Sequence, residues 1–145
     1  MDLNLIEMKQ TNDKCFIDTN ILLYCYAKYE SEKKSIARHV TEISNTVIRN
    51  QVLSEVSNVL NKKHNFNWDF IELILLDIMS DHLFEINRTN TIVQTCTIAN
   101  RNKYSFYDSC IIAATLKRNC SILFSEDMQY GQVIENKLTI INPFN

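Results

Sequence analysis

Two acidic residues follow short apolar runs near the two ends of the chain. Asp18 comes directly after Cys15-Phe16-Ile17, and Asp127 follows Ile122-Leu123-Phe124 within three residues. If both runs are neighbouring parallel strands, the two carboxylates project over the same edge of a sheet, where α/β proteins bind ligands. Two like charges held there favour a cation between them, and Mg²⁺ prefers carboxylate oxygens. Each Asp could equally cap the helix or turn that follows its strand, and the sequence leaves both interpretations open.

Two further acids, Glu55 and Asp108, are predicted to lie on helices. Glu55 falls at the flank of an apolar stripe between Val52 and Leu60, about 100° from its centre at ~100° per residue. A flank position is typical of a surface glutamate, but it also lets a carboxylate reach along the core boundary into a cleft. Asp108 is the third residue after Ser105, which fits a capping box. The helix beyond it is apolar nearly all round, so it is expected to pack on the sheet and hold Asp108 near a half-buried edge.

The elements that must position these acids alternate between strands and helices. We expect strands at residues 15–17, 46–48, 82–86, 121–124 and 138–141. We expect helices at residues 21–29 (with Thr19 or Asn20 as N-cap), 31–43, 52–64, 67–79, 89–100 and 105–118. Residues 1–13 are expected to be a loose or strand-like lead-in, and residues 128–134 a turn or short helix around Gly131. This alternation predicts a single α/β domain over residues 1–145, with a mainly parallel central sheet between two helical layers.

The composition is that of an ordinary globular protein, with 46% hydrophobic and 22% charged residues. One glycine and one proline argue for long helices, and against a many-turned β-sandwich or a glycine-rich phosphate loop. The formal net charge is -2. Setting aside the four acids leaves a mildly basic remainder, so net charge neither excludes nor indicates an RNA partner.

The cysteines and the termini indicate a cytoplasmic protein. The five cysteines contain no Cys-x-x-Cys pair and mostly lie in apolar runs, which is typical of reduced core thiols. The N-terminal residues show no signal-peptide pattern, and no segment approaches the ~20 apolar residues of a membrane span. The three histidines have no ligand spacing, so no histidine-based metal site or acid is predicted.

The segments around the four acids resemble the motifs of PIN-domain nucleases. Residues 16–24 (FIDTNILLY) are similar to the opening motif, and residues 51–56 (QVLSEV) to the second acidic helix. Residues 105–114 (SFYDSCIIAA) resemble the third motif, residues 123–134 (LFSEDMQYGQVI) the fourth, and residues 140–144 (IINPF) the closing strand. The motifs occur in the expected order over nearly the whole chain. The compact size is similar to that of the VapC-type toxins of type II toxin–antitoxin pairs.

This resemblance implies a metal-dependent endoribonuclease. The residues implied to hold Mg²⁺ or Mn²⁺ are Asp18, Glu55, Asp108 and Asp127. Thr19, Asn20 and Ser125 are implied to orient the carboxylates or a metal-bound water, whereas the role of Glu126 stays open. The resemblance further implies an RNA substrate, a homodimer, and a cognate antitoxin that docks near residues 36–43 and 52–60.

Two other functions remain open. Asp18 could be the nucleophile of an aspartyl phosphatase, although that chemistry usually needs a second Asp two residues on, where this chain has Asn20. Alternatively, the chain could be a binding module that regulates a partner by protein contact. The basic residues that could contact phosphates are Lys33, Lys34, Arg38, Arg49, Lys62, Lys63 and Lys103. Tyr107 and Tyr130, beside acidic motifs, are candidates for stacking on bases.

Overall fold

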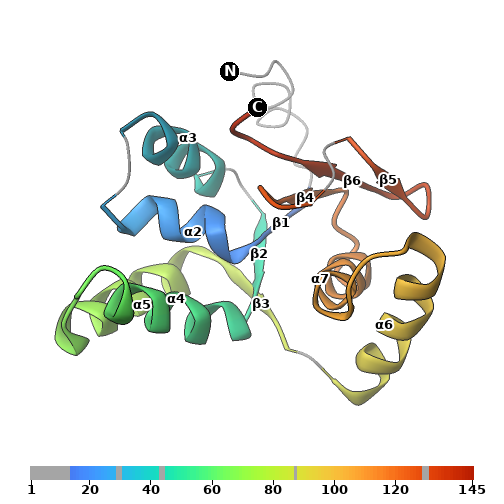
Figure 1. The fold of residues 1–145 in the computed structure, drawn as a ribbon, viewed down its shortest axis with the longest axis horizontal. Coiled ribbons are helices and arrows are strands. Elements are labelled where there is room, and N and C mark those ends of the chain that lie inside the picture. The colour runs from blue at the N-terminus through green and yellow to red at the C-terminus, as the bar shows by residue number, and fades with distance from the viewer. Residues whose placement is uncertain (1–13, 29–30, 43–44, 87, 129–130) are drawn as a thin grey trace.

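The computed structural model describes residues 14–28, 31–42, 45–86, 88–128 and 131–145. The expected lead-in at residues 1–13 and the candidate stacking residue Tyr130 lie outside the described residues. Strands and helices follow one another in the expected order along the chain (Figure 1). Among the described residues, none of the helices is long and apolar enough to span a membrane.

Six strands of the described residues form one sheet. They are β1 (Cys15–Ile17), β2 (Thr46–Arg49), β3 (Leu83–Glu85), β4 (Ile122–Phe124), β5 (Val133–Ile134) and β6 (Leu138–Ile141). Their order across the sheet is β3-β2-β1-β4-β6-β5, and every neighbouring pair is parallel except β5 and β6. Ile17 of β1 is level with Phe124 of β4, so the residues after these strands leave the sheet at the same edge. The register therefore brings Asp18 next to the segment that contains Asp127.

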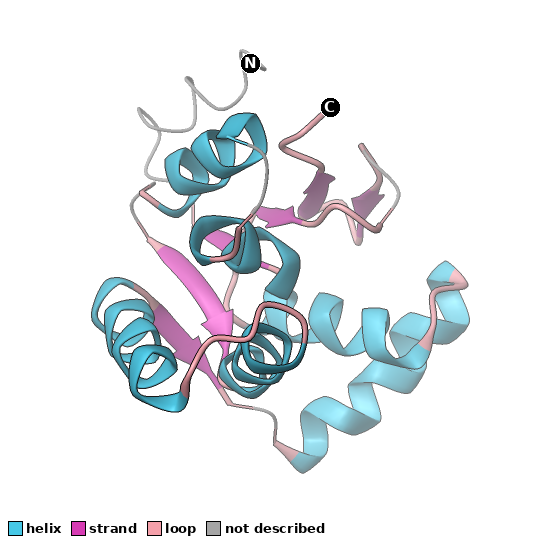
Figure 2. Ribbon diagram, turned by 60° about the vertical axis from the view of Figure 1, so that its left-hand side comes forward, coloured by secondary structure: helices cyan, strands magenta, loops and turns pink. Residues whose placement is uncertain are grey.

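Helices cover both faces of this sheet (Figures 1 and 2). One layer holds α2 (Thr19–Tyr26), α3 (Ser31–Thr41), α4 (Gln51–Lys62) and α5 (Trp68–Asp81), and the other holds α6 (Thr89–Asn102) and α7 (Phe106–Lys117). In β4, Ile122 and Phe124 pack with the first layer, whereas Leu123 packs with the second. This alternation is what a strand buried on both faces requires. The three-layer α/β fold predicted from the sequence is confirmed.

The start of α2 differs from the expectation. Asp18, rather than Thr19 or Asn20, is the N-cap, because its carboxylate accepts a hydrogen bond from the backbone N–H of Thr19 at 2.7 Å. The helix accordingly begins at Thr19 instead of Ile21 and ends at Tyr26. Thr19 and Asn20 therefore lie in the first turn of α2, where their side chains are free to contact other elements.

The prediction of a turn or short helix at residues 128–134 was wrong for its last two residues, which form strand β5. Glu135 and Asn136 both have positive φ, at 53° and 54°, and Lys137 N–H donates to the carbonyl of Ile134 at 3.0 Å. This turn folds Val133 and Ile134 back against β6. Glycine usually marks such a turn, and neither Glu135 nor Asn136 is a glycine, so the residue pattern contains no clear hairpin signal.

Candidate active site

Asp18 lies at the carboxyl edge of the sheet, where β1 is flanked by β2 and β4. Its backbone N–H donates to the carbonyl of Phe124 at 3.1 Å, which fixes the main chain to β4. The half-buried carboxylate accepts hydrogen bonds from Thr19 N–H at 2.7 Å and from the Ser125 hydroxyl at 3.1 Å. Ser125 itself is fully buried. Asp18 thus caps α2 and also presents a carboxylate at the sheet edge, so the two interpretations of the sequence are compatible.

Two consecutive residues of α2 contact acids from distant parts of the chain. Thr19 Oγ1 donates to Glu55 Oε2 on α4 at 2.5 Å. Asn20 Nδ2 donates to Asp127 Oδ2, beyond β4, at 2.7 Å. Together with the Ser125 hydroxyl, these contacts give three of the four acids a polar side-chain donor each.

Asp108 reaches the same region from the other helical layer. Ser105 caps α7, and its Oγ accepts a hydrogen bond from the backbone N–H of Asp108 at 3.2 Å. The helix beyond is largely buried against the sheet, as the sequence predicted. Within the described residues, no hydrogen bond or ion pair involves the carboxylate of Asp108. The cap engages only the backbone of Asp108, and the residue lines a cleft together with the other three acids.

The four acids line one open cleft of about 440 Å³. Thr19 and Asn20 also line it, whereas Ser125 lies beneath the carboxylate of Asp18. Gln51 and Asn58 were not singled out from the sequence, yet they line the cleft with Glu55. Their offsets from Glu55, four residues before and three after, place all three on one face of α4. That spacing was the available sequence signal.

Negative charge is in excess in the cleft, which four acids line. Burial raises the pKa of the Asp18 carboxyl above its ordinary value, and hydrogen bonds from Thr19 and Ser125 act in the opposite direction. The nearby charges of Glu55 and Asp127 raise this pKa further. A divalent cation in the cleft would offset that repulsion.

Oxygen ligands make up the candidate metal centre. Among the side chains that the structure describes, no three acidic, His or Cys groups converge into a ready-made coordination shell. The carboxylates instead surround an open space. This donor set fits a hard divalent ion that keeps several waters and uses one or two carboxylates. It does not fit a structural zinc site, which takes Cys or His ligands.

The sequence from residue 15 to residue 135 matches the family model of the PIN domain. The chain belongs to the PIN domain family. The matched range contains all four acids of the cleft and every strand except β6. No curated protein matches the chain significantly.

Solved structures share the fold of this PIN domain. VapC20 of Mycobacterium tuberculosis, described as a sarcin–ricin loop cleaving toxin, matches with a TM-score of 0.60 and 17% identity over 79% of this chain and 92% of VapC20. PAE2754 of Pyrobaculum aerophilum matches with a TM-score of 0.53 and 17% identity over 81% of this chain and 82% of PAE2754. At this level of identity, both likenesses establish the fold alone.

Glu126 does not line the acidic cleft of the PIN domain, although it neighbours Asp127. Its Oε1 lies 2.6 Å from Lys33 Nζ, and its Oε2 accepts a hydrogen bond from the Tyr24 hydroxyl at 2.8 Å. Lys33 also lies over the rings of Tyr24 and Phe144, at 4.9 and 5.2 Å from their centroids. Glu126 therefore joins α2 and α3 to the end of β4. Lys33 is engaged in this contact, which argues against its predicted role with phosphate.

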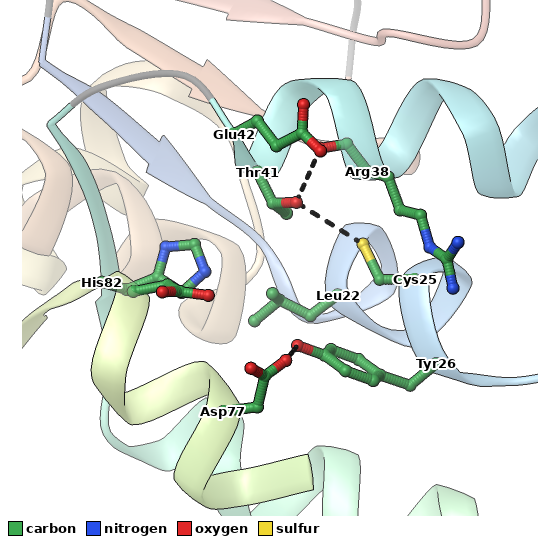
Figure 3. A pocket seen from close by; sticks show the side chains of 9 residues that line it. Leu22, Cys25, Tyr26, Arg38, Thr41, Glu42, Asp77 and His82 are labelled. Atoms are coloured by element: carbon green, nitrogen blue, oxygen red, sulfur yellow. Dashed lines mark hydrogen bonds between the residues drawn. The ribbon is translucent and has the colours of Figure 1, made fainter.

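A larger cavity of about 580 Å³ lies elsewhere in the PIN domain, between α2, α3 and the end of α5 (Figure 3). Several of its polar side chains bond to one another. The Tyr26 hydroxyl donates to Asp77 at 2.6 Å, and Cys25 Sγ lies 3.8 Å from Thr41 Oγ1. Burial raises the pKa of the Cys25 thiol to about 11, so the thiol is protonated at neutral pH and is a poor nucleophile. The acidic cleft is the better candidate site despite its smaller volume.

His82, at the edge of the larger cavity, is expected to make stability depend on pH. Its Nδ1 lies 2.6 Å from Thr46 Oγ1, and burial lowers the pKa of the imidazole, opposed by the charges of Asp81 and Asp77. Because the folded-state pKa lies below the unfolded one, the neutral ring stabilises the fold above about pH 6.5. This contribution is lost as the pH falls through the folded-state pKa.

Urea unfolding between pH 8 and pH 5 measures this dependence. We expect the free energy of unfolding to decrease by up to about 1.4 kcal/mol per pH unit within the affected range. His82→Gln is expected to remove that decrease, and the control His64→Gln to retain it. A decrease that persists unchanged in His82→Gln would assign the proton uptake to another group.

Proposed function

We propose that this PIN domain is a metal-dependent endoribonuclease that hydrolyses RNA phosphodiester bonds and acts as the toxin of a type II toxin–antitoxin pair. The observation that carries the nuclease assignment is the convergence of four acids, each from a different element, on one open cleft. The likeness to VapC20, described as a sarcin–ricin loop cleaving toxin, supports the toxin assignment. We further propose that residues 1–145 act as one domain in the cytoplasm.

The chain's own groups prepare the cleft for metal and RNA. The residues that would hold Mg²⁺ or Mn²⁺ are Asp18, Glu55, Asp108 and Asp127. When bound, such an ion would polarise the phosphodiester and make a nearby water more acidic. Thr19, Asn20 and Ser125 each donate to one carboxylate. They thereby fix the ligand positions before binding, and this preorganisation reduces the rearrangement needed during reaction.

An exposed tyrosine at the cleft supports a substrate with unpaired bases. Tyr107 lines the cleft and is 73% exposed. Its ring stands edge-on to that of Phe106, with centroids 5.7 Å apart. Unpaired bases stack on such rings, whereas paired bases within a helix are inaccessible to them. We infer that the substrate is a single-stranded segment or loop of RNA.

Two protein partners belong to this proposal. A cognate antitoxin is expected to dock near α3 and α4, because α4 carries Glu55 and an occupant there could block the cleft. A homodimer is expected by analogy with other PIN-domain toxins.

Two alternatives are distinguished by particular observations. In an aspartyl phosphatase, the residue two positions after the nucleophile is an acid, whereas Asn20 occupies that position and donates to Asp127. Activity that survives Asp127→Asn would favour this alternative. A binding module without catalysis would be favoured if calorimetry detected no divalent metal binding.

Mapping of RNA cleavage tests the proposed function. Purified protein is incubated with total cellular RNA and Mg²⁺ or Mn²⁺, with EDTA in a parallel reaction, and new 5′ ends are mapped. We expect discrete cuts that EDTA abolishes. Absence of both cleavage and metal binding would contradict the nuclease function.

Thr19→Val is expected to weaken catalysis without unfolding the protein. Valine matches threonine in shape but cannot donate to Glu55, so this carboxylate loses its orienting bond. Loss of a residue that orients a metal ligand typically lowers metal affinity or activity by about 10- to 100-fold. Mn²⁺ calorimetry and cleavage rates measure the effect. The control is Thr95→Val, at a buried threonine of α6 whose hydroxyl bonds to its own helix. Equal losses in both variants would indicate a general packing effect.

A further inference from the structure

Arg49 is a buried cation that lines the acidic cleft. It is the last residue of β2 and is only 6% exposed. One guanidinium nitrogen donates to Gln51 Oε1 at 2.5 Å. Its Nε is buried without a hydrogen-bond partner, and among the described residues Arg49 forms no ion pair. Most of its five N–H donors are therefore available.

The carboxylate opposite Arg49 in the sheet is engaged by other cations. Arg49 on β2 pairs in register with Glu85 on β3. Glu85 Oε1 lies 3.0 Å from Lys117 Nζ, and its Oε2 lies 3.5 Å from a guanidinium nitrogen of Arg118. A buried cation without a partner carries a desolvation cost. An anion that enters the cleft would remove that cost, which makes Arg49 a candidate ligand-binding group.

The N-terminus of α4 adds a second source of positive potential directly after Arg49. Asn50 is the N-cap of α4, but its side chain makes no capping hydrogen bond, and the first turn contains no acidic residue. Gln51, the first residue of the helix, lines the cleft. Uncapped N–H groups at a helix N-terminus bind anions, phosphates above all.

We propose that Arg49 and the first turn of α4 form a phosphate subsite within the acidic cleft, which holds an RNA backbone phosphate next to the one that is hydrolysed. This assignment rests on the proposed nuclease function. A guanidinium can bind two phosphate oxygens at once, so it fixes the direction of the backbone as well as its position. Since the four acids repel phosphate, a local cation is needed to keep the strand in the cleft.

Binding of RNA, rather than its cleavage, tests the subsite. A fluorescein-labelled 12-nucleotide single-stranded RNA is titrated by anisotropy with Ca²⁺ in place of Mg²⁺ or Mn²⁺, and a gel verifies that it stays intact. Arg49→Gln is expected to weaken binding by roughly 10- to 100-fold. The slope of log K against log salt concentration is expected to become shallower by about 0.7, the value for one phosphate contact on a single strand.

Arg101→Gln is the matched control. Arg101 lies on α6, is exposed and pairs with Glu135 at 3.1 Å, so the change removes the same charge away from the cleft. Its affinity and salt slope are expected to stay close to those of the wild type. Unchanged affinity and slope in a folded Arg49→Gln variant would overturn the subsite, as would equal losses in both variants.

Two further readouts keep the subsite testable. If Arg49→Gln fails to fold, the Nε–H resonance of Arg49 in the wild-type protein is followed by NMR during titration with inorganic phosphate in EDTA. A shift at Arg49 that is absent at Arg101 supports the subsite, and no shift overturns it.

The subsite proposal and the nuclease proposal can also fail separately. Arg49-dependent RNA binding by a protein that neither cleaves RNA nor binds metal contradicts the nuclease function alone, whereas cleavage with Arg49-independent binding contradicts the subsite alone.

Discussion

Asp18→Asn is expected to reduce RNA cleavage by more than about 100-fold. Loss of a residue that only orients a metal ligand costs up to roughly 100-fold, and Asp18 is proposed to hold the metal itself. The same change is expected to raise the melting temperature of the metal-free protein. Burial and the charges of Glu55 and Asp127 raise the pKa of Asp18 in the fold. The fold therefore loses stability as the pH rises from the pKa of Asp18 in the unfolded chain to its higher pKa in the folded protein. Ionisation of this carboxylate therefore destabilises the fold, and Asn removes the charge while keeping the size of the side chain.

Thermal unfolding with and without Mn²⁺ separates these effects. In EDTA, Asp18→Asn is expected to melt above the wild type. Saturating Mn²⁺ should stabilise the wild type by about 2.7 kcal/mol at 100 times the dissociation constant, and the variant by much less. Asp69→Asn, at an exposed acid of α5, is the control and should change neither cleavage nor the Mn²⁺ response. A variant that cuts at the wild-type rate, or that melts below the wild type in EDTA, would contradict this assignment.

The sequence predicted the position of the acids because strand ends in a parallel sheet are geometrically determined. Once the two apolar runs are neighbours, the residues after Ile17 and Phe124 share one edge. The cap at Ser105 likewise determined where α7 begins and therefore where Asp108 lies. These features depend on local sequence and on topology, which are both readable from residue pattern.

The tertiary contacts that distinguish one polar residue from its neighbour could not be predicted from the residue pattern. Glu126 and Asp127 are adjacent, yet only Asp127 lines the cleft, because Lys33 and Tyr24 bond to Glu126. That outcome depends on where α3 packs, which is a tertiary property. Arg49 was one of seven candidate basic residues, and only its burial in the cleft sets it apart.

One tripeptide explains much of the site's organisation. Asp18 starts α2, and this places Thr19 and Asn20 in the first helical turn with their side chains directed to Glu55 and Asp127. These two bonds join chain segments that are 36 and 107 residues apart in sequence. The geometry of the cleft therefore depends on how firmly β1 and β4 are held together in the core.

Phe124→Ala is expected to cause the largest loss of stability among the variants considered. Phe124 is the last residue of β4, is fully buried, and packs with the layer formed by α2 to α5. Truncation of a buried phenylalanine costs about 3–5 kcal/mol, because it removes apolar contacts and leaves a cavity. For a chain of this size, that loss lowers the melting temperature by about 10–16 °C. Urea and thermal unfolding measure it directly.

The location of the loss matters for the site as well as for the fold. Phe124 leads directly into Ser125 and Asp127, so the cavity is expected to loosen the segment that carries these groups and to weaken Mn²⁺ binding in the variant that remains folded. Phe70→Ala is the matched control, since Phe70 is 49% exposed on α5 and its truncation should cost about 1 kcal/mol or less. If Phe124→Ala retained wild-type stability and Mn²⁺ affinity, the packing of β4 could not be what holds Asp127 beside Asp18.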